Sequence, residues 1–165
     1  MTVVVKAKSE PDAHALRHAY SMFPSGVTAI CALVDGKPTG VVASSFTSVS
    51  LDPPLVSICV AHTSGTWPIL RSASRIGVSV LGEGHRDVVR QLAAREGDRF
   101  SGLAHDADGD ALLLHEAALR AVCSIEREVL AGDHLIAVLR VHSVDPHPEV
   151  EPIVFHASGF RLPAH

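Results

Sequence analysis

Short apolar runs of strand length, each closed by a turn signal, constrain this chain more than any other feature of its sequence. Residues 27–34 are apolar and β-branched, and the Asp35-Gly36 pair that follows them is a strong hairpin signal. From residue 119 onward, apolar and polar side chains alternate, as in a strand with one buried face. A parallel, doubly wound sheet needs a helix after each strand, and such helices are missing. The sequence therefore predicts a mainly β fold, a closed or partly closed antiparallel barrel with a few helices.

Six or seven strands joined by hairpins are expected. They cover residues 27–34, 40–45, 55–61, 76–81, 119–126, 135–144 and 153–155. A first helix is expected over residues 9–23, with Ser9 as its cap and Pro11 in its first turn. A short helical turn at residues 67–70 and a helix over residues 87–95 complete the pattern.

Composition places the chain among folded proteins of one domain. Its 165 residues are 47% hydrophobic and 19% charged, which is enough for an ordinary core. We expect a single domain over residues 1–165, with residues 1–9 as a flexible amino-terminal arm. The formal net charge of −4 gives no electrostatic footprint for nucleic acid or for an anionic membrane surface.

The cellular location is predicted to be the cytoplasm. No apolar run approaches the roughly 18 residues needed to span a bilayer, and the amino end has too short an apolar patch for a secretory signal. Cys31, Cys59 and Cys123 each fall in an apolar, strand-like run, and no CxxC pair occurs. We expect them to be buried, reduced thiols, as is usual in a cytosolic protein.

Hydroxyl side chains gather in two places, each after a predicted strand. Residues 41–60 read VVASSFTSVSLDPPLVSICV, and this segment places five hydroxyl side chains before a double proline: Ser44, Ser45, Thr47, Ser48 and Ser50. A second cluster, residues 63–66, opens the short helical turn. Hydroxyls and backbone N–H groups suit a ligand with carbonyls, ring nitrogens and a phosphate. Serine and threonine turns that satisfy their own backbone are an equally open alternative.

A third cluster is Gly132-Asp133-His134, at the entrance of the strand predicted over residues 135–144. A hairpin turn with a surface histidine is the simpler interpretation. In the functional interpretation, the ring of His134 is held at the strand entrance, where it faces a ligand.

Two other patterns are weaker as functional sites. Gly82 and Gly84 lie between a strand and a helix, but a dinucleotide fingerprint requires a small residue where Asp87 stands. His14 and His18 have the i, i+4 spacing of a metal-binding pair on the first predicted helix, yet no third ligand is suggested nearby. We therefore predict neither a dinucleotide-binding loop nor a metal site.

A serine hydrolase is a further hypothesis, with Ser44 or Ser45 as nucleophile beside His134 and Asp133. The sequence has no GxSxG nucleophile elbow. An Asp-His pair adjacent in sequence seldom places the carboxylate against the ring as an orienting group. This hypothesis is therefore weak.

Several motifs follow one another in a fixed order over nearly the whole chain. SMFPSGVTAI occupies residues 21–30, and GVVASSFTSVSLDPP occupies residues 40–54. They are followed by HTSGTWPIL, the GDRF element at residues 97–100, the GDH turn and the closing FHASGF. Together they resemble the flavin reductase-like family, the small reductase components of two-component flavin monooxygenases. Val41-Val42 replaces the usual Met-Thr of this family, and Ser44 stands where many relatives have Asn.

The resemblance implies an FMN-binding split barrel, antiparallel and Greek-key-like, with NAD(P)H:flavin oxidoreductase activity. The residues that it assigns to the flavin are Val42, Ala43, Ser44 and Ser45 along the isoalloxazine ring, Ser50 and Leu51 at its border, and Ser64 and Thr66 at the phosphate. The histidine of the GDH turn, His134, would position the nicotinamide, with Asp133 beside it.

The resemblance further implies FMN or FAD as the flavin, and a homodimer with flavin near the subunit boundary. NADH is favoured over NADPH as the donor, because no arginine cluster is evident for a 2′-phosphate. Hydride would pass from the nicotinamide to the flavin, and the reduced flavin would leave for a partner flavin-dependent monooxygenase. Two alternatives stay open: a flavin-binding or flavin-storage protein without turnover, and a split-barrel flavin oxidase that acts directly on a small substrate.

Overall fold

The computed structural model describes residues 10–162 of the 165-residue chain. The arm expected over residues 1–9, and with it the predicted cap Ser9, lies outside the described residues. The strands of the main sheet are β2 Thr28–Val34, β3 Lys37–Ala43, β4 Thr47–Leu51, β5 Pro54–Ala61, β6 Ile76–Val80, β7 His105–Asp108, β8 Ala111–Leu114, β9 Leu119–Ala131 and β10 His134–Pro146. They run in the order β4-β5-β10-β9-β6-β2-β8-β7, and β3 also pairs with β2.

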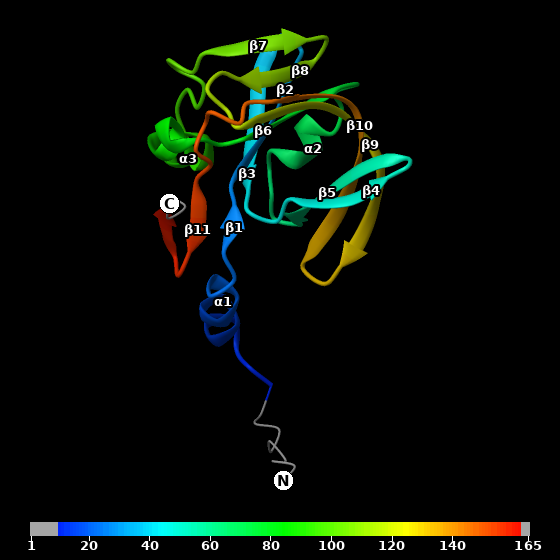
Figure 1. The fold of residues 1–165 in the computed structure, drawn as a ribbon. Helices are drawn as coiled ribbons and strands as arrows, with labels where there is room; N and C mark the ends of the chain where they lie inside the picture. The colour runs from blue at the N-terminus through cyan, green and yellow to red at the C-terminus, as the bar shows by residue number, and fades with distance from the viewer. Residues whose placement is uncertain (1–9, 163–165) are drawn as a thin grey trace.

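A second, three-stranded sheet and a few short helices complete the fold. The sheet has the order β1-β11-β12, with β1 Ser25–Gly26, β11 Val154–His156 and β12 Gly159–Arg161. The helices are α1 Ala13–Ser21, α2 Trp67–Leu70 and α3 Arg86–Ala93, and η1 Glu83–His85 is a 3₁₀ turn. Helix α2 lies against β2 and β3, and α3 lies against β3 (Figure 1). Within residues 10–162, no helix has the length and apolar character needed to cross a membrane.

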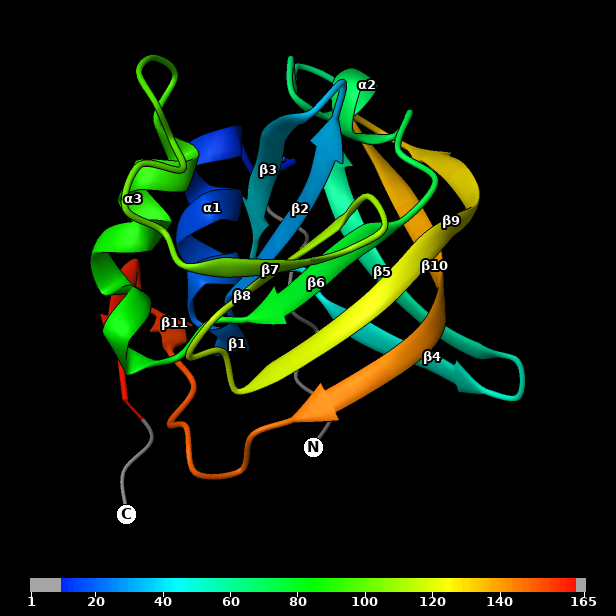
Figure 2. The same cartoon turned by 90° about the horizontal axis from the view of Figure 1, so that it is seen from above.

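The main sheet curves around one apolar core (Figures 1 and 2). Ile30, Ile58, Ile76 and Leu139 come from four different strands and are fully buried in this core. The long pair β9–β10 shifts its register twice, as β-bulges do where they bend a ribbon. Every strand pair is antiparallel, so the predicted mainly β, antiparallel fold is confirmed.

A second apolar cluster fixes α3 beside the barrel. Leu92 of α3 packs there with Leu81, Leu112 and Ile153, and all four are almost fully buried. Gly77 on β6 permits a close approach of the β7–β8 hairpin, because a Cβ at this position would lie 1.9 Å from the Leu112 carbonyl oxygen. The carboxyl end of α3 is therefore held at a defined place near the end of β3.

Both predicted hairpin turns are confirmed. Asp35 and Gly36 join β2 to β3 with positive φ angles of 51° and 73°, as a type I′ turn requires. Between β9 and β10, Gly132 has a φ of 63° whereas Asp133 has no positive φ, which is the pattern of a type II′ turn. The second turn places His134 at the first residue of β10.

The prediction of six or seven strands is wrong, because residues 10–162 contain twelve. The strands that the sequence did not indicate are short or polar: β1, β4, β7, β8 and β12. Strand β4 falls inside the predicted hydroxyl loop, where Thr47, Ser48 and Ser50 pair with β5. A mostly exposed strand rich in Ser and Thr lacks the apolar alternation by which strands are recognised.

Helix α1 is shorter than predicted. Asp12 rather than Ser9 caps it, since the Asp12 carboxylate accepts a hydrogen bond of 2.7 Å from a backbone N–H of the first turn. Pro11 therefore precedes the helix instead of lying in its first turn. No residue of α1 is buried, and Tyr20 and Phe23 are 70% and 76% exposed. None of its residues belongs to either apolar cluster of residues 10–162.

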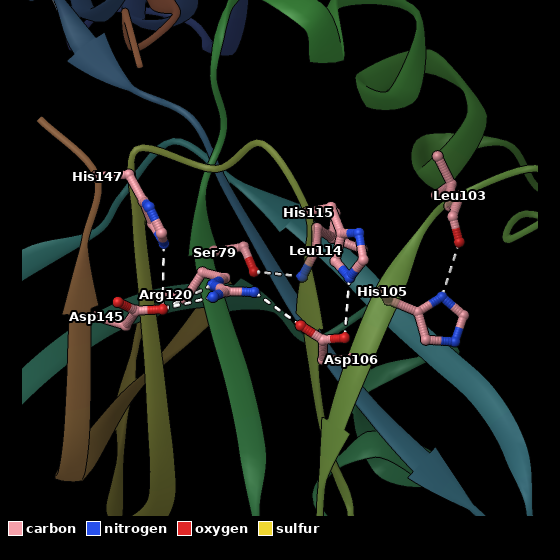
Figure 3. Close-up of polar contacts among 9 residues, drawn as sticks. All are labelled: Ser79, Leu103, His105, Asp106, Leu114, His115, Arg120, Asp145 and His147. Atoms are coloured by element: carbon pink, nitrogen blue, oxygen red, sulfur yellow. Dashed lines mark hydrogen bonds and ion pairs between the residues drawn. The ribbon is translucent and has the colours of Figure 1, made fainter. Parts of the chain in front are cut away.

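Arg120 on β9 joins three strands through a network of charges (Figure 3). Its guanidinium donates to Asp106 on β7 at 2.9 Å and to Asp145 on β10. His115 bonds the same Asp106 at 2.9 Å, and His147 bonds Asp145 at 3.1 Å. The bond from His115 is the main cause that lowers the pKa of Asp106, and the bond from Arg120 lowers the pKa of Asp145. The network holds the β7–β8 hairpin against the β9–β10 pair.

Candidate functional site

The barrel is open between β3 and β5. Among the described strands, β3 pairs only with β2, while β5 lies between β4 and β10. A cavity of about 910 Å³ lies along this gap. Its walls are residues 41–45 from the end of β3, residues 59–61 of β5, residues 63–66 before α2, residues 92–95 at the end of α3, Arg99 and His134. Its volume is typical of a small-molecule site.

Ser45 joins the two sides of this gap. Its hydroxyl accepts a hydrogen bond from the Cys59 N–H at 2.8 Å and donates to the Cys59 carbonyl at 3.3 Å. The β4–β5 ladder pairs Thr47 with Ser57, so Ser45 and Cys59 stand two residues further along in the same register. The serine side chain therefore bonds the backbone edge of β5 where β4 no longer does.

The loop of residues 63–66 uses its hydroxyls in part for its own structure. Ser64 Oγ accepts a hydrogen bond from the Trp67 N–H at 3.2 Å at the start of α2. Thr66 Oγ1 accepts a hydrogen bond from Arg99 at 3.4 Å. The alternative of a local turn is therefore correct for Ser64. It does not describe Ser45, whose hydroxyl bonds the backbone of Cys59 on another strand.

Hydroxyls remain that the protein does not use. Ser44 and Thr63 line the cavity, and within residues 10–162 neither hydroxyl makes a hydrogen bond. Val42 and Ala43 contribute apolar wall between them and the core. This side of the cavity thus combines an apolar surface with free donors at a strand edge, which suits a flat, polar-edged ring system.

His134 faces the cavity from the start of β10, where it pairs with Ala61 of β5. Its Nδ1 lies 2.7 Å from Oδ1 of Asp133. This hydrogen bond is the main cause that lowers the pKa of Asp133, and the charge of His134 adds to it. The expectation that an adjacent Asp-His pair does not orient the ring is wrong here, because the tight turn folds the carboxylate back onto the imidazole. The bond at Nδ1 leaves Nε2 for a ligand.

The bonded pair of His134 and Asp133 is one part of a serine hydrolase site, but a serine nucleophile bonded to His134 is missing. No hydrogen bond joins His134 to Ser44 or Ser45, although all three line the same cavity. The hydroxyl of Ser45 is engaged with Cys59. A serine nucleophile needs its base within hydrogen-bond reach, so the arrangement does not support acyl transfer.

Two arginines at the cavity were not singled out by the sequence. Arg99 is half-buried, and its Nη1 donates to the carbonyls of Gly40 at 3.2 Å and Leu92 at 3.3 Å. Within the described residues, no carboxylate pairs with Arg99 or with Arg95. A guanidinium without a counter-ion, beside free hydroxyls, favours an anionic ligand group such as a phosphate. The GDRF element contains Arg99 and was the signal that could have identified it.

The structure brings most of the predicted site residues together. Those that line the cavity are Val42, Ala43, Ser44, Ser45, Ser64, Thr66 and His134. Asp133 reaches the cavity through its bond to His134. Ser50 and Leu51 lie on β4 and do not line it, and Leu51 is 95% exposed. A contact of Ser50 and Leu51 with a ligand ring stays a prediction.

Comparison with protein families and curated proteins gives extended matches. The model described as flavin reductase like domain matches residues 20–162. A probable flavin reductase from Rhizobium meliloti is 39% identical over 132 residues, which are 79% of this chain and 42% of that protein, so the chain spans less than half of its length. The reductase subunit HsaB of a flavin-dependent monooxygenase from Rhodococcus jostii is 32% identical over 151 residues, 90% of this chain and 77% of that protein.

Solved structures share the fold. The NADH:FAD oxidoreductase SgcE6 of Streptomyces globisporus, in complex with NAD and FAD fragments, matches with a TM-score of 0.86 and 34% identity. The match covers 93% of this chain and 93% of that chain. The split barrel predicted from the sequence is therefore confirmed over nearly the whole chain.

Cys59 is exposed in the cavity, so the prediction that all three cysteines are buried is wrong. It lies between the buried residues Ile58 and Val60 on β5, and alternation along the strand turns its side chain out of the core. Cys31 and Cys123 are buried, and burial raises the pKa of each thiol to about 12.

We expect a thiol-specific alkylating reagent to modify Cys59 alone in the folded protein. The thiolate is the reacting form, and Cys31 and Cys123 supply almost none of it at neutral pH. Intact-mass measurement should show one adduct per chain, peptide mapping should place it at Cys59, and denaturant should expose the other two. Modification of Cys31 as fast as Cys59 in the native protein would contradict this assignment.

Proposed function

Because the chain belongs to the flavin reductase-like domain family, we propose that it catalyses the NAD(P)H-dependent reduction of FMN or FAD and supplies reduced flavin to a partner monooxygenase. NADH is the proposed donor. The observation that carries the proposal is the cavity between β3 and β5. One wall of the cavity is the end of β3 with the unbonded hydroxyl of Ser44, and a second wall is the loop of residues 63–66. His134 lines the cavity from the start of β10.

The residues at the cavity fit a flavin. Val42 and Ala43 offer apolar wall for a tricyclic ring, and Ser44 offers a donor for its carbonyls and ring nitrogens. The loop of residues 63–66 and the unpaired guanidinium of Arg99 suit the phosphate. When bound, the flavin supplies the two-electron chemistry, and the protein supplies binding and orientation.

His134 is proposed to position the nicotinamide. Asp133 holds its Nδ1 and so fixes both the ring orientation and the nitrogen that faces the cavity. The bond from His134 lowers the pKa of Asp133 further below its ordinary acidic value, so its carboxylate stays ionised well below neutral pH. A ring fixed in this way can hold a partner at one distance and orientation, which is the main contribution that a protein makes to such a reaction.

The relatives support the remaining parts of the proposal. HsaB of Rhodococcus jostii is named as the reductase subunit of a flavin-dependent monooxygenase, and SgcE6 is named as an NADH:FAD oxidoreductase. By likeness to these proteins we propose a monooxygenase partner and NADH as donor. The cytoplasmic location stays a prediction from the sequence.

We propose a homodimer because several large apolar side chains are exposed. Four large apolar side chains are 70–95% exposed: Tyr20 and Phe23 at α1, Leu51 at the tip of the β4–β5 hairpin and Leu130 at the tip of the β9–β10 hairpin. Such side chains are common at the interfaces of self-associating proteins. A second copy that covers β4 would also bring Ser50 into an interface, near the subunit boundary where the flavin is expected.

Anaerobic mixing of the purified protein with NADH and excess FMN or FAD tests this function. Catalytic loss of the visible flavin absorbance, over many equivalents per chain, is expected. Loss of at most one equivalent would favour a flavin-binding or storage protein. Loss of flavin absorbance with another small molecule as the electron donor, and none with NADH, would favour a flavin oxidase.

Replacement of His134 by Ala is expected to raise the KM for NADH and lower kcat, together about tenfold in kcat/KM, with flavin affinity retained. Asp133→Ala should act in the same direction with a smaller effect, because the imidazole remains but loses its fixed orientation. Steady-state kinetics at saturating flavin measure both. Unchanged KM and kcat in His134→Ala would rule out the proposed role.

Replacement of Arg99 by Ala is expected to raise the KM for FMN and FAD about tenfold, while the KM for riboflavin stays as in the wild type. Riboflavin has the same ring and no phosphate, so comparing its KM change with that of FMN or FAD isolates the phosphate contact. Arg90→Ala is the matched control, since Arg90 is exposed on α3 and does not line the cavity. An equal loss for riboflavin would exclude a phosphate contact for Arg99.

A further inference from the structure

Glu128 differs from most other carboxylates of the chain because it is sheltered and bonded to a single helix. It lies on β9, and its side chain is 16% exposed. Its Oε1 accepts a hydrogen bond from the indole Nε1 of Trp67 at 2.7 Å, and its Oε2 pairs with Nη2 of Arg71 at 2.6 Å. Trp67 opens α2 and Arg71 follows its last residue, so one carboxylate holds both ends of this helix.

Helix α2 carries one wall of the cavity. The loop of residues 63–66 runs directly into it, and the Trp67 N–H donates to Ser64 of that loop. The side chain of Trp67 is 2% exposed, between the cavity loop and the barrel core. A helix of four residues has no stability of its own, so its position depends on such contacts.

The two sides of α2 are held by different parts of the barrel. Leu70 packs into the main core, and α2 lies against β2 and β3. Glu128 contacts α2 from β9, which β6 and β2 separate from β3 in the sheet order. In Figure 2, α2 lies between the ribbons of β2 and β9. The charge-assisted hydrogen bond from the Trp67 indole to the sheltered carboxylate is strong and directional. The ion pair contributes less, because the side chain of Arg71 is half exposed.

We propose that Glu128 is a positioning residue for flavin binding. By holding Trp67 and Arg71, it keeps the loop of residues 63–66 where the loop meets the phosphate end of the flavin. Glu128 does not line the cavity and acts only through α2. The inference rests on the proposed function, since it concerns the ligand of that cavity.

Glu126 provides a matched control. It lies two residues earlier on β9, and its carboxylate bonds Arg140 of β10 at 2.8 and 2.9 Å. It makes no hydrogen bond or ion pair with α2, and it does not line the cavity. Removal of either glutamate therefore costs β9 an ion pair, but only the loss of Glu128 releases α2.

The experiment compares the wild type with Glu128→Ala and Glu126→Ala. Glu128→Ala is expected to raise the Kd and KM for FMN and FAD about tenfold, the equivalent of one charge-assisted hydrogen bond. The KM for NADH at saturating flavin and kcat should stay within about twofold of the wild type. Glu126→Ala should change none of these values.

A second readout does not depend on turnover. Trp67 is the single tryptophan of the chain, so its emission reports the surroundings of α2 directly. Glu128→Ala should shift this emission, and Glu126→Ala should not. Glu128→Gln keeps a carbonyl oxygen for the indole N–H and loses the charge that faces Arg71, so it should recover part of both the emission and the flavin affinity.

Flavin affinity as in the wild type in a folded Glu128→Ala variant with shifted emission would overturn the proposal. Equal losses of flavin and NADH affinity in both alanine variants would overturn it too, because they would indicate general destabilisation. If Glu128→Ala does not fold, Glu128→Gln decides: flavin affinity unchanged despite shifted emission would reject the inference. Absence of flavin reduction by the wild type would reject the proposed function instead, and FMN binding with Trp67 emission would still judge the role of Glu128.

Discussion

The free edge of β3 is the constraint on which the site depends. Backbone N–H and C=O groups at a strand edge need partners, and where no neighbouring strand supplies them, side chains, water or a ligand must. Here Arg99 donates to the carbonyl of Gly40 at 3.2 Å, and Ser45, which follows the end of β3, bonds the facing strand β5 at Cys59. Polar side chains thus keep the barrel open where another ladder would close it. The cavity is therefore a product of strand topology and needs no large gap in the packing of the core.

The architecture was predictable wherever local chemistry has only one solution. Asp35-Gly36 permits two successive positive φ angles, and the apolar runs on both sides of it then pair as a hairpin. The helical turn of residues 67–70 was predicted with its observed limits. Strand β4 and the β7–β8 hairpin were not predictable in this way, because their stability comes from neighbours distant in sequence. For β7–β8, one such neighbour is Arg120.

The site was predictable in its residue types more than in its bonds. Hydroxyl clusters indicated where a polar ligand could lie. However, the hydroxyl oxygens of Ser45 and Ser64 accept hydrogen bonds from the backbone N–H groups of Cys59 and Trp67. Whether a hydroxyl is free depends on register, which the sequence does not show. The contribution of Arg99 is of the same kind, since a guanidinium is recognised as unpaired only when every nearby carboxylate has been placed. Motif order identified the family, whereas partners in space identify what each motif residue does.

Helix α1 has a consequence for how assembly and folding are connected. It has nine residues, none of them buried, and a helix of that length is marginal in water on its own. The barrel core draws on none of its side chains. If α1 lies in the interface of the proposed homodimer, its folding and the self-association of the chain are linked equilibria, and dilution would unfold α1 while the barrel stays folded. The fraction of chains in the dimer would then determine how much of α1 is helical.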